Sequence, residues 1–351
     1  MFGQESLHRC VHRIAGTGTR FPVLAALWLI ALSGAAMPAA ATTIVTFDPS
    51  GSTATYPYAI NGSGVITGYY MNASHVSRGF VRGSNRKITS FSVSGSTGTV
   101  ADCINDSGTI AGRYSDTNGI FHGFVRTGAG AITTFSPVRA AATVPSGINS
   151  AGTITGYYMD ESGVDHGFVR ASDGKIASFD VSGAAGTYPF AINDGGVITG
   201  SYVSSEQSRG FVRARNGTIT TFDPSSESID TEAYAINSYG AVAGSYTIYG
   251  YPEDTEQGFI RAADGSYSYP SISGAVDIYA QALNNGLSVT GNYYDASYVS
   301  HGYYMTSNST VTSFDPNEST GTFPFGINAD GAITGYWTDA SNRFHGFLYT
   351  P

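Results

Sequence analysis

The sequence predicts an all-β protein, a seven-bladed β-propeller with four antiparallel strands in each blade. The main evidence is a motif that recurs seven times and reads Ile-Asn-x-x-Gly in six of its copies. Its asparagines are 44 residues apart at every step but one, which is 47. A repeat of about 40–50 residues is typical of a four-stranded propeller blade. The stretch 42–351 has the length of seven such units. The repeated asparagines are Asn61, Asn105, Asn149, Asn193, Asn237, Asn284 and Asn328.

Each repeat contains four short segments with the character of β-strands. In the fourth copy these segments are 187–193, 197–202, 209–213 and 218–222. They are rich in β-branched and aromatic residues and are bounded by Gly, Asn, Asp and Ser, as strands usually are. No stretch after residue 41 has a sustained apolar period of 3.6 residues, so we expect no helix there.

The Asn-x-x-Gly element predicts a tight hairpin between the first and second strands. The Asn side chain is expected to accept a hydrogen bond from the backbone two residues on, and the Gly to supply a positive φ. The sixth copy, Asn284-Asn285-Gly286, has its Gly one place earlier, which predicts a different turn type in the same register. The seven asparagines are therefore interpreted as structural turn formers rather than ligands.

Two aromatic markers accompany the Asn motif and predict how the ring closes. One is Gly-Phe or Gly-Tyr, and the other is Phe-Asp-Pro or a relative; both are expected to fill the space between blades. The chain opens on the second marker, at Ile44–Phe47, and closes on the first, at Gly346–Tyr349. The count of strands is whole only if the N-terminal strand completes the last blade, which also removes open sheet edges.

The first 41 residues have the pattern of a secretory signal peptide. Three arginines precede an apolar run, Val23–Leu32, and the small residues Ala39–Ala41 offer a cleavage site before Thr42. The run is short for a bilayer about 30 Å thick, and nothing later resembles a membrane span. We expect residues 1–41 to be the signal, 42–351 to be the propeller, and the protein to be secreted after cleavage near Ala41.

The composition argues against nucleic acid and anionic membranes as partners. Without residues 1–41, the chain carries 14 Lys and Arg against 25 Asp and Glu, so its surface is acidic. Cys103 is then the single cysteine, which excludes an internal disulfide. It lies in a core-facing stretch with no evident neighbouring base, so a buried, unreactive thiol is expected.

The motifs resemble those of a bacterial family of extracellular repeat proteins, the HAF family, named for a His-Ala-Phe signature. The corresponding stretches begin at His122, His166, His301 and His345, together with Asn-x-x-Gly-x-Ile-Thr-Gly at four of the asparagines. This chain differs in having Gly for Ala throughout and Arg78, Arg209 and Gln257 in place of three histidines. The resemblance covers essentially all of 42–351 and implies a secreted, propeller-like protein, with no established activity.

Variation between the repeats concentrates on one face, which we call the top face. It carries the loops between the second and third strands of each blade and the crossings from one blade to the next, and loops on a rigid scaffold commonly carry function. Aromatic rings beside polar donors suit sugars, although packing between blades is the plainer interpretation of any one of them. The candidate ligand-binding residues are Tyr69, Tyr70, His122, Tyr157, Tyr158, His166, Tyr202, Arg209, Tyr293, Tyr294, His301, Tyr336, Trp337 and His345.

No local motif indicates a catalytic centre, a metal site or a cofactor. The histidines fall one per blade rather than at the close spacing of metal ligands. Arg82, Arg126, Arg170, Arg213 and Arg261 are expected to bond turn carbonyls or Asp106 and Asp194 near the opposite, bottom face. We expect a monomeric, non-catalytic protein that binds a glycan or a partner protein through its top face. The alternatives are a propeller hydrolase or lyase acting on polysaccharide, and a purely structural surface protein.

Overall fold

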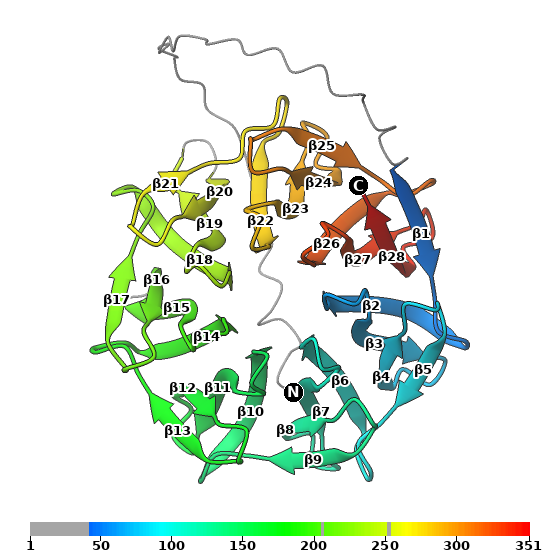
Figure 1. Ribbon diagram of the computed structural model, residues 1–351, viewed down its shortest axis with the longest axis vertical. Helices are drawn as coiled ribbons and strands as arrows, with labels where there is room; N and C mark the ends of the chain where they lie inside the picture. Colours follow the sequence, from blue (N-terminus) through cyan, green and yellow to red (C-terminus); the bar gives the residue numbers. More distant parts are fainter. Residues whose placement is uncertain (1–41, 205–206, 251–253) are drawn as a thin grey trace, which may run out of the picture.

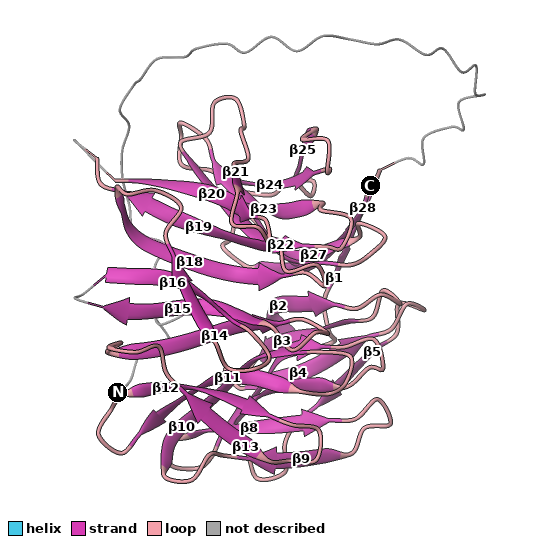
Figure 2. Ribbon diagram, turned by 60° about the vertical axis from the view of Figure 1, so that its left-hand side comes forward, coloured by secondary structure: helices cyan, strands magenta, loops and turns pink. Residues whose placement is uncertain are grey.

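The computed structural model describes residues 42–204, 207–250 and 254–351, and these form seven four-stranded antiparallel sheets arranged around an axis. Figure 1 shows the blades following one another around the ring in chain order. Figure 2 shows strands joined by short loops and no helix among the described residues. The prediction of an all-β, seven-bladed propeller is confirmed.

The four strands of a blade follow in chain order from the axis outward, and blades are numbered here from the N-terminus. The innermost strands are β2 (Ser52–Ile60), β6 (Gly98–Ile104), β10 (Ala140–Ile148), β14 (Gly186–Ile192), β18 (Ser228–Ile236), β22 (Asp277–Leu283) and β26 (Gly321–Ile327). The second strands are β3 (Ile66–Asn72), β7 (Ile110–Ser115), β11 (Ile154–Asp160), β15 (Ile198–Ser204), β19 (Val242–Ile248), β23 (Val289–Tyr294) and β27 (Ile333–Thr338).

The outer half of each blade contains a third strand and a shorter edge strand. The third strands are β4 (Ser77–Arg82), β8 (Phe121–Arg126), β12 (Asp165–Arg170), β16 (Gln207–Arg213), β20 (Thr255–Arg261), β24 (Ser300–Met305) and β28 (Phe344–Thr350). The outermost strands are β5 (Ile88–Phe91), β9 (Ile132–Phe135), β13 (Ile176–Phe179), β17 (Ile219–Phe222), β21 (Tyr267–Ser268), β25 (Val311–Phe314) and, in blade 7, β1 (Thr43–Phe47).

The N-terminal strand closes the ring, as predicted. Strand β1 pairs antiparallel with β28 from Thr43↔Thr350 to Phe47↔Gly346, so the first strand of the described chain is the outermost strand of the last blade. The two strands lie side by side at the right of Figure 1. Closure removes two unpaired sheet edges that would otherwise be free to join another chain.

A ring of hydrogen bonds between asparagines joins all seven blades. The side-chain amide of each motif Asn donates to the backbone carbonyl of the motif Asn in the next blade, at 2.9–3.3 Å. The last of these bonds runs from Asn328 back to Asn61 across the closure. All seven side chains are buried. The predicted turn formers therefore also connect neighbouring blades, a role that the sequence motif did not reveal.

Each of these asparagines also builds its own turn. Its side-chain oxygen accepts from the backbone N–H four residues on in all seven copies, and from the N–H two residues on in Asn61, Asn237 and Asn328. The sixth copy keeps the same turn, because Leu287 itself adopts a positive φ of 58° where the other copies have Gly. The expectation of a different turn type at Asn284 is therefore wrong.

Aromatic rings fill the junctions between blades, as predicted. The Phe of an outermost strand meets the Phe of the next blade's third strand edge to face, at 5.8–6.2 Å, in six of the junctions. The guanidinium groups of Arg82, Arg126, Arg170, Arg213 and Arg261 lie 4.6–4.9 Å from the same outer Phe rings. These cation–π contacts strengthen the junctions.

The predicted partners of these arginines are only partly correct. Arg126, Arg170 and Arg261 donate to the carbonyl of the following residue, at 3.3–3.4 Å. Asp106 and Asp194 instead accept from backbone N–H groups of the Asn turn in the preceding blade. The carboxylates therefore add to the Asn ring rather than to the arginine contacts.

The Asn ring can be tested with Asn193→Asp. Aspartate keeps the acceptor for the N–H of Val197 but replaces the amide donor with an oxygen that faces the carbonyl of Asn237. We expect the free energy of unfolding to fall by about 1–3 kcal/mol, the usual effect of losing one partner of a buried hydrogen bond. Denaturant unfolding of the Asp variant and the parent measures this, and equal stability would show that the bond between blades contributes nothing.

Candidate functional site

The strand directions place the candidate residues on the predicted face. Strands alternate in direction within each blade, so the second-to-third-strand loops and the crossings to the next blade share the top face. The Asn turns lie on the bottom face. In each blade a ring from the second strand stands directly opposite the His, Arg or Gln of the third strand.

A histidine held between two carboxylates occurs at the top of blade 3. The ring of His166 lies 5.2 Å from that of Tyr158, its partner across the strands. Its Nδ1 is 3.0 Å from Asp180, which begins the crossing to blade 4. Its Nε2 is 3.3 Å from Asp160, which begins the loop between β11 and β12. We call this arrangement the His clasp, because one imidazole joins two top-face loops.

The clasp recurs around the ring. His301 joins Asp315 and Asp295, and His345 joins Asp48 and Asp339, with rings stacked on Tyr293 and Trp337. His122 bonds Ser136 and Asp116 and packs on Tyr114, and Arg209 bonds Asp223 at 2.7 Å.

The clasp also reaches the neighbouring blade. The crossing-loop carboxylates Asp48, Asp223 and Asp315 each accept a hydrogen bond from a buried Thr of the next innermost strand. His345 thereby fastens the ring closure, since Asp48 follows β1 and its partner Thr55 belongs to blade 1. The structure places the predicted histidines in contacts that anchor the top-face loops.

Electrostatics favour a protonated imidazole in two clasps. Partial burial disfavours the charge on His166, but hydrogen bonds to Asp180 and Asp160 outweigh burial and raise its pKa. The pKa of His301 is raised in the same way by Asp315 and Asp295, again against partial burial. In the loop of blade 3, the backbone N–H of Val164 and the Ser162 hydroxyl hold the pKa of Asp160 well below its usual range.

These shifts predict how the clasp depends on pH. A His whose pKa is raised on folding stabilises the fold below about pH 6.5, and the benefit is lost as pH rises through its folded pKa. The pKa values of Asp160 and Asp295, which begin the top-face loops, are lowered on folding. Their contribution to stability is therefore present above about pH 4 and is lost only on further acidification. We expect the double variant His166→Gln, His301→Gln to lower Tm more at about pH 5.5 than at about pH 8.5. An equal Tm loss at both pH values would contradict a protonated clasp.

The remaining predicted residues are packed against other rings or buried. Tyr69 stacks on Tyr56 at 4.7 Å, Tyr157 meets Tyr188 at 5.2 Å, and Tyr336 packs on aromatic rings of β26. The structure brings these residues together within blades and across junctions, not as one continuous exposed rim. Tyr70, Tyr202, Tyr336 and Trp337 are each less than a tenth exposed, and Tyr294 packs against Tyr279.

Several buried charged residues near the axis were missed by the sequence analysis. Arg113 on β7 bonds Asp102 on β6 at 2.8 Å, and both are nearly buried. Burial raises the pKa of Asp102 to about 6 although Arg113 opposes this, and its second oxygen has no partner among the described residues. The available signal was a departure from the repeat, because Arg113 stands where blades 1, 3 and 7 have Tyr.

A second buried carboxylate lies on β18. Burial raises the pKa of Glu232 to about 7, despite hydrogen bonds from Ser208 and Ser201. Burial also raises the pKa of Glu256 on β20. Within the described residues, no group of three or more His, Cys, Asp or Glu is arranged as metal ligands. Cys103 is buried, and burial raises the pKa of its thiol, so it is unreactive in the folded protein.

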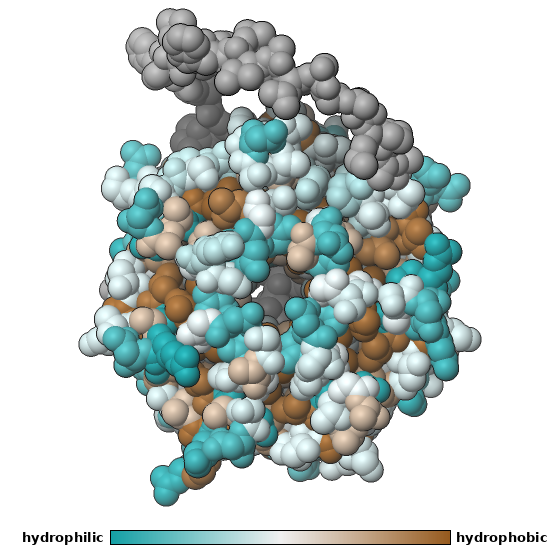
Figure 3. Space-filling model, viewed as in Figure 1, coloured by the Kyte–Doolittle hydropathy of each residue, from teal (hydrophilic) through white to brown (hydrophobic). Residues whose placement is uncertain are grey.

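Most of the exposed large apolar residues of the described chain lie on the top face. Tyr239 and Leu287 are on bottom turns; the others are Ile120, Phe121, Val138, Val164, Tyr249, Tyr269 and Tyr298. Four of them belong to blades 2 and 3 and are called the apolar top patch: Ile120, Val138 and Val164 lie in loops, and Phe121 begins strand β8. Figure 3 shows hydrophilic and hydrophobic residues interspersed over the face in view, with an opening near the axis.

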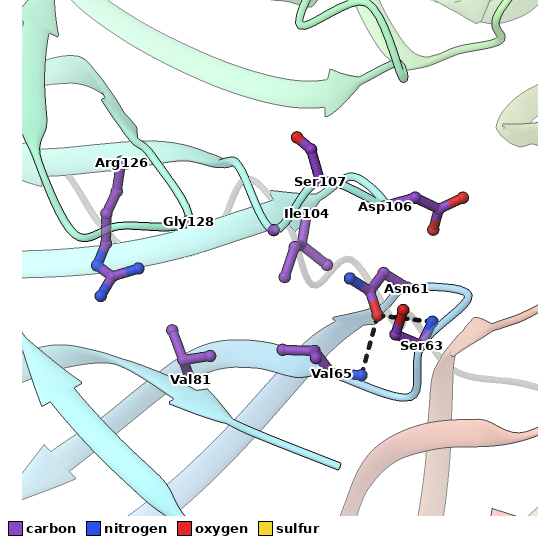
Figure 4. Close-up of a pocket in the computed structure, with 10 residues that line it drawn as sticks. Asn61, Ser63, Val65, Val81, Ile104, Asp106, Ser107, Arg126 and Gly128 are labelled. Carbon is purple, nitrogen blue, oxygen red and sulfur yellow. Dashed lines mark hydrogen bonds between the residues drawn. The ribbon is translucent and has the colours of Figure 1, made fainter.

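Two hollows lie between blades. One, on the bottom face, has a volume of about 350 Å³ and is lined by residues of blades 1 and 2, including Val65, Ile104 and Arg126 (Figure 4). The other has a volume of about 490 Å³ and lies between the crossing loop from blade 6 and strands β1 and β27 of blade 7. Its lining residues are Ile44, Thr46, Asp315, Pro316, Asn317, Glu318 and Trp337.

Comparison with known proteins supports the fold alone. No family model matches the chain, and no curated protein matches its sequence. Similar solved structures include a streptogramin B lyase (TM-score 0.58, 15% identity, 88% of this chain and 98% of that one). Virginiamycin B lyase from Staphylococcus aureus, solved as an inactive variant with quinupristin, gives a TM-score of 0.57, with 15% identity, 89% of this chain and all of that one.

A third similar structure is the propeller domain of the trilobed protease from Pyrococcus furiosus, with a TM-score of 0.59, 9% identity, and coverage of 85% of this chain and 95% of that one. That domain is described as having an open velcro topology, whereas the ring here is closed by β1.

In the part of the chain that the structure describes, no helix is long and apolar enough to cross a membrane. The expected signal peptide lies outside the described residues.

Proposed function

We propose that this chain is a secreted propeller that binds a glycan or a partner protein through its top face without transforming it. The observation that carries the proposal is the concentration of exposed apolar side chains on top-face loops. Loops on a rigid scaffold commonly carry binding sites, and exposed apolar side chains on such loops are available for contact with a ligand. The His clasps support it further, since they fix the bases of these loops and leave the tips in solvent.

The proposed ligand surface is the apolar top patch of blades 2 and 3. Val138 is 90% exposed, so its contacts with the fold are few. Two other candidates are poorer targets for mutation: Tyr157 packs against Tyr188 of the next blade, and Trp337 is buried against His345. Substitution of the loop tips separates binding from folding.

The test is the triple variant Ile120→Ser, Val138→Ser, Val164→Ser. We expect at least a tenfold loss of affinity, about 1.4 kcal/mol, for whatever glycan or protein the parent captures on an array or in a pull-down. The matched control is Tyr239→Ser, which removes a residue 73% exposed on the bottom face and should bind like the parent. Loss of binding in the control, with binding kept in the triple variant, would move the site to the bottom face.

An enzymatic role on a polysaccharide is the second candidate, and one observation favours it. A carboxyl group with a pKa of about 7, such as Glu232, is suited to general acid–base catalysis. The lyases with a similar fold show that such scaffolds occur among enzymes. Turnover of a bound polysaccharide that is lost in Glu232→Gln would decide for this role.

The secreted location and the membership of the HAF repeat family are part of the same proposal. They are supported by the pattern of residues 1–41 and by the His-Gly-Phe and Asn-x-x-Gly repeats. We expect N-terminal sequencing of the exported protein to begin at or within two residues of Thr42. An exported chain that retains Arg20 would contradict signal cleavage.

A further inference from the structure

We propose that the groove beside Trp337 is a binding subsite for a neutral sugar ring. This inference rests on the proposed binding role of the top face and names the chemistry of one part of it. The groove lies where the crossing loop Asp315–Glu318 passes over strands β1 and β27 of blade 7. Its volume of about 490 Å³ falls within the range of about 300–1,000 Å³ that is typical of small-molecule sites.

The first supporting observation is a donor without an acceptor. Trp337 is 8% exposed, and its indole N–H has no hydrogen-bond partner among the described residues. At the same position in blades 3 and 6, the hydroxyls of Tyr158 and Tyr293 bond to serines of the outermost strand. Buried polar groups are nearly always satisfied, so an orphan donor in a residue that lines a groove points to a ligand or an ordered water there.

The second observation is a glutamate in an unfavourable backbone conformation. Glu318 has a φ of 66°, in the left-handed region. The equivalent crossing-loop residues Gly51, Gly95, Gly183 and Gly274 have the same conformation, which Gly adopts without strain. Glu318 is exposed and its carboxylate makes no hydrogen bond within the described residues. Arg139 has the same conformation in the crossing loop from blade 2, so it is the position of Glu318 in the lining of the groove that distinguishes it.

The groove chemistry matches a neutral pyranose. Half-buried Ile44 supplies apolar surface for the CH face of a ring, beside the largely buried Pro316 and Trp337, and Asn317, Glu318 and Thr46 supply polar groups for its hydroxyls. Asp315 is already bonded to His301 and Thr322, so it contributes little more. The free carboxylate of Glu318 disfavours an acidic sugar by charge repulsion.

Trp337 provides a direct readout, because it is the single tryptophan after residue 41. The exported protein is titrated with methyl glycosides of glucose, galactose, mannose and N-acetylglucosamine, and with methyl glucuronide. We expect a saturable change in tryptophan emission with at least one neutral glycoside and none with the glucuronide. Absence of any change with the neutral glycosides, confirmed by the absence of a saturation-transfer NMR signal, would overturn the proposal.

A matched pair of variants separates binding from backbone strain. Glu318→Gly removes the carboxylate and relieves the left-handed residue; Arg139→Gly relieves the same conformation, φ 61°, in the crossing loop from blade 2. Both variants should raise Tm, but only Glu318→Gly should weaken the glycoside, by at least tenfold. Equal glycoside affinity in the two variants would show that Glu318 has no part in a site.

The apolar top patch gives the remaining comparison. Its triple Ser variant should bind methyl glycosides like the parent, because the patch lies on blades 2 and 3. The triple variant could lose a macromolecular ligand while the parent binds no glycoside. That result would overturn the sugar subsite in the groove and leave the proposed binding role of the top face unaffected. If the parent binds a glycoside and Glu318→Gly does not, the sugar subsite is supported, even if the triple Ser variant keeps all of its ligands.

Discussion

The ring of asparagine hydrogen bonds is the constraint on which the rest of the structure depends. Each motif Asn shapes its own hairpin and also reaches the next Asn, so it fixes the separation of neighbouring blades at the bottom face. Seven such bonds form a closed ring only if every blade presents its turn at the same place. The 47-residue step from Asn237 to Asn284 satisfies this, because its extra residues extend the top-face loop between β19 and β20. The bond between the two asparagines remains 3.2 Å long.

With the bottom face fixed by this ring, variation is tolerated at the top. The Phe and Arg contacts hold the outer junctions, and the His clasps fasten the loops at their bases. The same contacts explain the Gly of the His-Gly-Phe motif. A Cβ at Gly123 would lie 2.5 Å from the ring of Phe135, which packs over it. The clasp, the packed Phe and the Gly therefore form one unit in which each residue restricts the others.

The sequence was sufficient for the fold, because a 44-residue period and the offset between first and last markers are global properties. It was insufficient to predict which of the aromatic side chains are accessible to a ligand. Tyr69 and Tyr70 are adjacent and point to opposite sides of a strand, but both sides of a blade are buried against neighbours. Alternation therefore does not indicate which ring is accessible. The pair Asp102–Arg113 was missed because its residues lie 11 apart on neighbouring strands and match no motif. Only comparison of equivalent positions across repeats could have indicated it.

Two residues show how comparison of repeats can distinguish a neutral substitution from one that belongs to a candidate site. Leu287 and Glu318 both adopt a left-handed conformation where sister repeats have Gly. At Leu287 the turn is held by the bond from Ser288 to the Asn284 side chain, so the turn survives loss of the Gly. Leu287 is 45% exposed on the bottom face and lines neither of the two hollows described, which is what neutral drift would leave. Glu318 has the same backbone conformation, but it lines a groove beside a buried indole N–H that has no partner. In a protein of repeats, the conformation alone identifies neither case; the surroundings of the departing residue distinguish them.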